Sequence, residues 1–320
     1  MEYSKIPHVK NQISKIVFGT AIGPMSGGED SGELLDAAFA MGINTFDTAR
    51  GYGQAEKMLG EWINSRNLRE RVNIITKGGH PLADGTKRVT REEIRLDVEL
   101  SRQAMGTDYF DVYLLHRDDP DVPVGKILEI LNELYEEGAI GAFGGSNWTR
   151  ERIQEANEYA AKHNLVPFSA TSPNFGLAEQ CCDVWGGGCT TIAGPEHAAD
   201  REWYGVNGIP VIAYSSLARG VFSGRIRSDQ LAMASDLLDP ISVRGYCSKA
   251  NFERLARVEK LSSEKGCSVA QLTLAYTMRQ PGMNVFAVCS STSAARMLSN
   301  TRALDVHLSE EEIAWLDLRK

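Results

Sequence analysis

The segment GINTFDTARGYGQAE (residues 42–56) places an acid at the end of a short apolar run and a tyrosine in the loop that follows. The run ends in Phe46 and is followed directly by Asp47, whereas Tyr52 stands between two glycines. Apolar and β-branched residues in such a run predict a strand. Glycines permit a sharp change of chain direction, which would let the loop fold back over the strand end.

The composition of the chain limits the classes of protein to which it can belong. The chain has 320 residues, with 42% hydrophobic and 24% charged residues, as in ordinary globular proteins. One barrel domain spanning residues 1–320 is a common size. The net charge of −8 argues against a broad basic surface for nucleic acid or anionic membranes. The polar start of the chain and the lack of a long apolar run predict a cytoplasmic protein without nucleic-acid or membrane partners.

Eight short β-rich runs alternate with helical patterns. The runs lie at residues 15–20, 44–49, 72–78, 110–116, 141–147, 167–173, 210–217 and 284–291. Helical spacing occupies residues 31–42, 91–106 and 124–138, two further helices within 251–280, and a terminal helix after Ser309. This alternation predicts an α/β fold, a (β/α)₈ TIM barrel. An open doubly wound sheet is the alternative, but no G-x-G-x-x-G opens the first helix.

Two of these helices carry start signals. Ser31 is expected to cap the first helix, which stops at a glycine, and Thr90 precedes a helix with acids in its first turn.

Polar side chains follow four consecutive runs. In barrels of this kind, active sites form at the carboxyl ends of the strands. The residues at these ends are Asp47, Tyr52, Lys77, His116, Ser146 and Asn147. Since neighbouring strands end at the same face of a barrel, we expect these side chains to converge at an active site on its C-terminal face.

The set suits proton transfer at a carbonyl group. Tyr52 is able to protonate a developing alkoxide if Lys77 stabilises its phenolate, and Asp47 would keep the ammonium charged and oriented. His116 would orient the carbonyl. No G-x-S-x-G, catalytic-cysteine pattern or P-loop is present, so hydride transfer from a bound cofactor fits best. Alternatively, Asp47 caps a turn, Lys77 is a surface charge and His116 is a hydrogen-bonded barrel-end histidine.

Two segments near the C-terminus indicate a phosphate site. AYSSLARGVFSGR ends in Arg225, and SSTSAARMLSN places Arg296 in a hydroxyl-rich helix start. Loops after the seventh and eighth strands often hold phosphate in such barrels. An ordinary Ser/Thr-capped surface helix is the alternative for the second segment.

The motifs FDTARGYGQAEKMLGEW, TKGG, VYLLHRDDP and GGSNW occur in the order found in the aldo-keto reductase superfamily, and the chain resembles that family from about residue 19 to 310. The resemblance implies a catalytic tetrad of Asp47, Tyr52, Lys77 and His116. Tyr52 would be the general acid, with His116 beside it facing the substrate. It also implies an NADP(H) cofactor across the barrel mouth, with NAD(H) less favoured.

The resemblance implies cofactor contacts as well. Ser146 and Asn147 would hold the carboxamide and Tyr214 would stack on the nicotinamide. Ser215, Leu217 and Arg225 would follow the pyrophosphate, and Arg296 and Asn300 would contact the adenosine end. Gly19, Thr20 and Asp47 belong to the same expected set. Ser172, Ser290 and Ser299 depart from the family's usual residues, which are glutamine, glycine or lysine, and glutamate.

Residues 181–205, after the sixth run, are expected to form a long loop. Long loops over a barrel mouth are usually functional. Trp185, Trp203 and Tyr204 in this loop, together with Trp148 and His80, would offer aromatic faces and hydrogen bonds, which weakly favours a sugar-like substrate. These aromatic residues would otherwise only pack the loop.

The same segment raises a zinc alternative through Cys181, Cys182, Cys189 and His197. Adjacent cysteines rarely reach one ion and the usual C-x₂₋₄-C spacing is missing, so we predict no metal.

The sequence therefore predicts an NADP(H)-dependent oxidoreductase that reduces an aldehyde or ketone, with a small carbonyl compound as its substrate. No pattern specifies an oligomeric state. A non-catalytic nicotinamide-binding subunit, of the kind that regulates ion channels, is the main alternative. A metal-dependent isomerase using Asp47 and His116 is disfavoured, because other strand ends lack further ligands.

Overall fold

The structure, a computed structural model, describes all 320 residues. Its contacts group the chain into two compact units, Met1–Ser172 with Ser290–Ala294, and Pro173–Cys289 with Ala295–Lys320. Eight parallel strands form a closed barrel in the order β10-β3-β4-β5-β6-β7-β8-β9. The predicted (β/α)₈ barrel is confirmed, and the single-domain expectation stays a prediction.

All eight predicted strands are present. Their bounds are β3 Ile16–Gly19, β4 Thr45–Asp47, β5 Asn73–Gly78, β6 Phe110–Leu115, β7 Ile140–Ser146, β8 Ala170–Ser172, β9 Val211–Ala213 and β10 Val285–Cys289. Every residue of β5 and β6 is buried. Strands of a parallel barrel are covered on both faces, which explains why β6, FDVYLL, is apolar at all but one position.

Strands β3 to β8 of the first unit pair in sequence order. Their register sets Gly19 opposite Asp47, Lys77 opposite Leu114, and Ser146 opposite Ser172. The polar strand ends therefore lie at one edge of this part of the sheet. A short antiparallel pair, β1 (Tyr3–Ser4) and β2 (Ile13–Ser14), precedes β3 and was not predicted.

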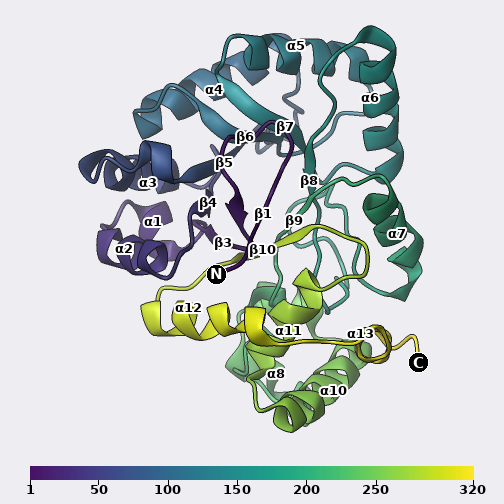
Figure 1. The fold of residues 1–320 in the computed structure, drawn as a ribbon. Coiled ribbons are helices and arrows are strands. Elements are labelled where there is room, and N and C mark those ends of the chain that lie inside the picture. Colours follow the sequence, from purple (N-terminus) through teal and green to yellow (C-terminus); the bar gives the residue numbers. More distant parts are fainter. The chain divides into compact units, whose positions relative to one another are not determined.

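The helices of the first unit surround these strands, and Figure 1 shows α3 to α6 on the outside of β4 to β8. Their bounds are α1 Gly23–Gly27, α2 Gly32–Ala40, α3 Ala55–Ser65, η1 Arg69–Arg71, α4 Arg91–Met105, α5 Val124–Glu136 and α6 Arg150–His163. No helix of the chain is long and apolar enough to cross a membrane.

The two predicted helix starts have different outcomes. Thr90 forms a full capping box with Glu93 at the start of α4. Ser31 makes no side-chain cap bond, so that expectation is wrong. Its backbone (φ −123°, ψ 19°) is not the extended conformation typical of a cap. Instead, the carboxylate of Asp30 accepts the Gly32 N–H at 2.8 Å.

The second unit contains β9 and β10, which pair in parallel with Val285 opposite Val211. Its other elements are η2 Pro195–His197, α7 Ala198–Val206, η3 Ala218–Gly220, η4 Leu231–Met233, α8 Ala234–Leu237, α9 Pro240–Tyr246, α10 Lys249–Lys265, α11 Val269–Met278, η5 Arg302–Asp305 and α13 Glu310–Leu316. Helix α12 (Ala294–Thr301) begins with the last residue of the first unit. The two helices predicted within 251–280 and the terminal helix predicted after Ser309 are confirmed, and Ser309 caps α13.

The expected long loop at residues 181–205 is shorter than predicted. Its last part forms η2 and α7, so Trp203 and Tyr204 lie on a helix, with Tyr204 buried. The expectation of a continuous loop is wrong because Arg201 and Tyr204, three residues apart, share the buried face of α7. Only Trp185 of the three aromatic residues remains in the loop.

A glycine pair lets β7 approach its neighbours closely. A Cβ atom on Gly144 would lie 1.9 Å from the Ala170 carbonyl oxygen of β8, and one on Gly145 would lie 2.4 Å from the Trp148 ring. These glycines immediately precede Ser146 and Asn147, so the close approach fixes where those side chains lie.

We therefore expect Gly144→Ala to destabilise the protein by at least about 2 kcal/mol, because the clash is with backbone rather than with a flexible side chain. Urea unfolding followed by circular dichroism measures this. Gly23→Ala is the control: no atom lies within 4 Å of its added Cβ, so its stability should stay within about 0.5 kcal/mol of wild type. Equal effects of the two substitutions would contradict the packing argument.

Candidate active site

A buried ion pair joins the ends of β4 and β5. The Lys77 ammonium donates to Asp47 Oδ2 at 2.5 Å and to the Thr48 carbonyl at 3.0 Å. The two side chains are only 4% and 7% exposed. Burial alone would lower the pKa of Lys77, but attraction by Asp47 and Tyr52 outweighs it, so that the pKa is raised. Lys77 is therefore a fixed cation, and neither it nor Asp47 is a surface charge.

Tyr52 reaches this cation from the loop after β4. Its backbone N–H donates to the Ala49 carbonyl at 3.0 Å, and the Lys77 ammonium lies 5.2 Å from the ring centroid. Gly53 has φ 62°, and a Cβ there would lie 2.5 Å from the Ser26 carbonyl oxygen. The turn therefore requires glycine at residue 53, whereas Gly51 has only ordinary contacts.

A second buried carboxylate fixes the far side of this loop. Glu56 accepts from Thr76 Oγ1 at 2.7 Å and from Arg50 at 3.1 Å. Sequence reasoning missed it, because an acid in the first turn of a helix is already expected from the helix dipole. Glu56 ties the loop that carries Tyr52 to strand β5.

His116 lies beside Tyr52 as a neutral imidazole. The backbone N–H of His116 donates to the Gly78 carbonyl at 2.7 Å, and its ring is 5.8 Å from that of Tyr52, nearly perpendicular to it. Burial lowers the pKa of His116 well below its usual value, and the nearby positive charge of Lys77 lowers it further. Loss of solvent raises the pKa of Tyr52, with Lys77 opposing this. At neutral pH the Tyr52 hydroxyl is therefore protonated and the His116 imidazole is neutral.

Arg117 is a buried residue that sequence reasoning missed. Its guanidinium donates to the His116 carbonyl at 2.8 Å, and the Asn147 amide donates to the same oxygen at 3.3 Å. Arg117 begins the charged sequence RDDP, and an arginine in such a run suggests a solvated surface residue. Only its burial in the folded structure distinguishes it from one. Its charge lowers the pKa values of both Tyr52 and His116.

The ends of β7 and β8 offer hydrogen-bonding groups beside the catalytic set. Ser146 Oγ and the Asn147 N–H both donate to the Ser172 carbonyl, at 3.0 and 3.1 Å. The hydroxyl of Ser172 is buried without a hydrogen-bond partner. Buried polar groups are nearly always paired, so this orphan hydroxyl fits a polar group of a bound molecule, such as a carboxamide.

The start of the barrel adds two of the expected cofactor residues. The Thr20 N–H donates to the Asp47 carbonyl at 2.9 Å, and the Gly19 carbonyl accepts from Ser290 Oγ at 2.9 Å. The Thr20 hydroxyl is buried without a partner. The first unit thus brings together Gly19, Thr20, Ser290 and Asp47 at the end of β4.

In the second unit, Tyr214, Ser215, Leu217 and Arg225 lie in the loop after β9. Ser215 and Arg219 have φ values of 56° and 52°. A Cβ on Gly220 would lie 3.8 Å from the Arg225 guanidinium. Successive backbone N–H groups in turns can form a concavity that suits an anion.

Helix α12 carries Arg296, Ser299 and Asn300. Arg296 is exposed. The Asn300 amide is buried and donates to Cys289 Sγ at 3.1 Å, and Ser299 Oγ accepts from Gln271 at 3.1 Å. Asn300 and Ser299 therefore already have partners within their own unit.

The two substrate residues expected outside the tetrad differ in exposure. Trp148 is fully buried, with its ring 5.0 Å from that of Phe168, and offers no face to a substrate. His80 is exposed, and its ring lies 4.8 Å from that of His116.

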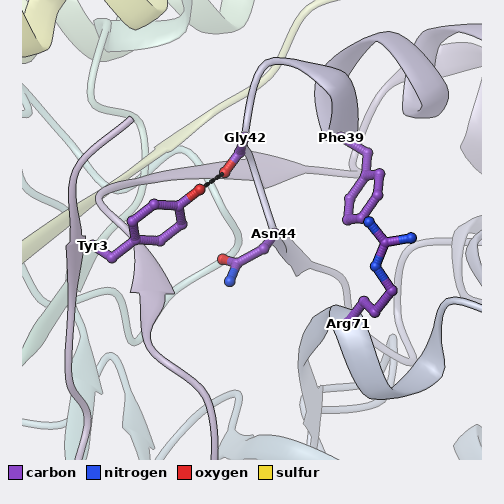
Figure 2. A pocket seen from close by; sticks show the side chains of 5 residues that line it. All are labelled: Tyr3, Phe39, Gly42, Asn44 and Arg71. Atoms are coloured by element: carbon purple, nitrogen blue, oxygen red, sulfur yellow. Dashed lines mark hydrogen bonds between the residues drawn. The ribbon is translucent and has the colours of Figure 1, made fainter.

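Neither a metal cluster nor a surface hollow elsewhere in the first unit adds to this site. No three His, Cys, Asp or Glu side chains are arranged to hold a metal ion. A hollow of about 320 Å³ is lined by Tyr3, Phe39, Gly42, Asn44 and Arg71 (Figure 2). Asn44 directly precedes β4, whereas Asp47 ends it, so this hollow lies at the other end of the strand.

Comparisons with known proteins agree with this geometry. The aldo/keto reductase family model matches residues 15–318, and the chain belongs to that family. It is 30% identical to aldo-keto reductase YhdN of Bacillus subtilis, over 89% of this chain and 83% of that protein. It is 26% identical to versiconal hemiacetal acetate reductase of Aspergillus parasiticus, over 99% and 96%. It is 24% identical to a putative voltage-gated potassium channel subunit beta of Schizosaccharomyces pombe, over 87% and 79%.

The electrostatics of His116 lead to a pH prediction. Because its pKa is depressed in the folded state, the imidazole should not titrate between pH 5.5 and 8. Histidine NMR shifts measure this, with His116→Gln assigning the signal.

The same depressed pKa affects stability. Below the ordinary histidine pKa of about 6.5, the imidazole of residue 116 binds a proton in the unfolded chain but stays neutral in the folded protein. The free energy of unfolding should therefore fall more steeply with acid in wild type than in His116→Gln. A midpoint near 6.5 for His116 would contradict this.

Proposed function

We propose that the protein is an NADP(H)-dependent oxidoreductase that reduces an aldehyde or ketone to an alcohol in the cytoplasm, with Tyr52 as the general acid. The observation that carries this is the protonated Tyr52 beside the buried Lys77–Asp47 pair and neutral His116. Membership of the aldo/keto reductase family supports carbonyl oxidoreduction.

The bound cofactor supplies the hydride, and the protein handles the proton. Tyr52 donates its hydroxyl proton to the carbonyl oxygen as negative charge develops there. Lys77 stabilises the resulting phenolate, while Asp47 holds the ammonium in place. Neutral His116 donates an N–H to the same oxygen and orients the carbonyl.

The proposed cofactor contacts follow from chemistry and the family resemblance. Ser146, Asn147 and the orphan hydroxyl of Ser172 would hold the carboxamide. We assign stacking to Tyr214, and the pyrophosphate to Ser215, Leu217 and Arg225. Arg296 would bind the 2′-phosphate of NADPH.

Tyr52→Phe removes one oxygen and keeps the ring. The rate of hydride transfer in a single turnover should fall about 10²–10⁴-fold, the range typical of losing a general acid, while NADPH still binds. Stopped-flow loss of NADPH absorbance measures the step.

Tyr3→Phe is the matched control, since the Tyr3 hydroxyl contacts only the Gly42 carbonyl outside this site. It should leave the rate unchanged. A near-normal rate in Tyr52→Phe would show that another group, with His116 first, supplies the proton.

Arg296→Ala tests the choice of cofactor. It should weaken NADPH binding by about 1.5–3 kcal/mol, the scale of a charge-assisted hydrogen bond, and barely change NADH binding. Fluorescence titration with both cofactors measures this, and Arg302→Ala is a control on a neighbouring exposed arginine. Equal losses for NADPH and NADH would mean that Arg296 does not bind the phosphate.

A non-catalytic, nicotinamide-binding regulatory subunit is the second candidate. Relatives of this chain include a protein described as a probable voltage-gated potassium channel subunit beta in Oryza sativa, at 25% identity. NADPH binding without turnover of any aldehyde, ketone or keto-sugar would favour this role. The complete set of proton-transfer residues favours the enzyme.

A further inference from the structure

We propose that His80 selects carbonyl substrates that carry a hydroxyl group on the carbon next to the carbonyl. This inference rests on the carbonyl reduction proposed above, and adds the class of substrate.

A buried carboxylate holds both ends of the loop that carries His80. Asp97 on α4 accepts the Gly79 N–H at 2.8 Å and two N–H groups of Arg88, at 2.9 and 3.1 Å. Asp97 is almost fully buried. Lys87 adds an ion pair with Asp119 at 2.8 Å. The loop between residues 79 and 88 is therefore anchored at both ends.

This anchoring sets the His80 ring against the catalytic groups. Its ring centroid is 4.8 Å from that of His116, at an interplanar angle of 87°. A Cβ at Gly51 would lie 3.8 Å from His80 Cδ2, so the ring lies close to the loop that carries Tyr52. His80 is exposed, whereas Lys77 and His116 are buried. His80 thus lies next to the position proposed for the substrate carbonyl oxygen, between Tyr52 and His116 and the solvent.

The hydrogen bonding of the ring decides what it recognises. His80 Nδ1 lies 2.9 Å from the Pro81 carbonyl oxygen. A carbonyl oxygen only accepts, so Nδ1 carries the hydrogen, and Nε2 of the neutral ring is left as an acceptor. An acceptor beside the carbonyl site suits a hydroxyl donor on the adjacent carbon. A carboxylate, which has no hydrogen to donate, does not suit it.

A substrate without that hydroxyl loses this hydrogen bond. Sites built to bind a substrate hydroxyl discriminate against analogues that lack it.

The test compares lactaldehyde with propanal, which differ only in the 2-hydroxyl group, at pH 8 with saturating NADPH. Wild type, His80→Phe and His80→Gln are measured, and His307→Phe is the control for the same change at another exposed histidine. Ratios of kcat/KM between variant and wild type cancel the intrinsic reactivity of each aldehyde.

His80→Phe should lower kcat/KM for lactaldehyde about ten-fold, the scale of one hydrogen bond, and change that for propanal less than about three-fold. His80→Gln keeps an acceptor and should recover part of the loss, and His307→Phe should match wild type. An equal loss for both aldehydes, or none, would overturn the role of His80 while leaving carbonyl reduction intact. If wild type binds NADPH and reduces neither aldehyde, the proposed reaction itself fails, and the role of His80 with it.

Discussion

The Lys77–Asp47 ion pair is the interaction on which the catalytic end of the barrel depends. Both charges are withdrawn from water, so removal of either partner would leave the other buried without compensation. The same cation acts on two neighbours. Its positive charge opposes the rise in the pKa of Tyr52, which favours a phenolate there. It also lowers the pKa of His116, which keeps that imidazole neutral. One buried charge thus gives the phenol and the imidazole different roles, although neither has an unusual covalent structure.

Two further buried carboxylates hold the loops around that pair. Glu56 ties the Tyr52 loop to Thr76 of β5, and Asp97 clamps both ends of the His80 loop. Glu56 lies in the first turn of α3 and Asp97 in the middle of α4, and each accepts from groups outside its helix. Tyr52 and His80 are consequently carried by loops whose ends are fixed by charge-assisted hydrogen bonds, which are stronger than neutral ones. Such anchoring favours a preorganised site.

The strand ends contribute through backbone as much as through side chains. The His116 carbonyl accepts from both Arg117 and Asn147, and the Ser172 carbonyl accepts from Ser146 and Asn147. Asn147 has φ 62°, a strained value for a residue other than glycine. These shared acceptors connect His116 with the side chains that we propose to hold the carboxamide. A change at either place would therefore disturb the other.

The sequence alone determined the eight strands, the barrel and the position of Asp47, Tyr52, Lys77 and His116 at strand ends, because periodicity and order along the chain are local properties. Tertiary structure decided what depends on burial and on distant partners. Arg117 in a charged run is buried, Trp148 is enclosed by Phe168, and Trp203 lies on a helix instead of in a loop. Glu56 looks like an ordinary helix-start acid, and Asp97 like an ordinary polar residue within a helix, until their partners are known. Solvent exposure and pairing come from segments far apart in the chain, which no local pattern records.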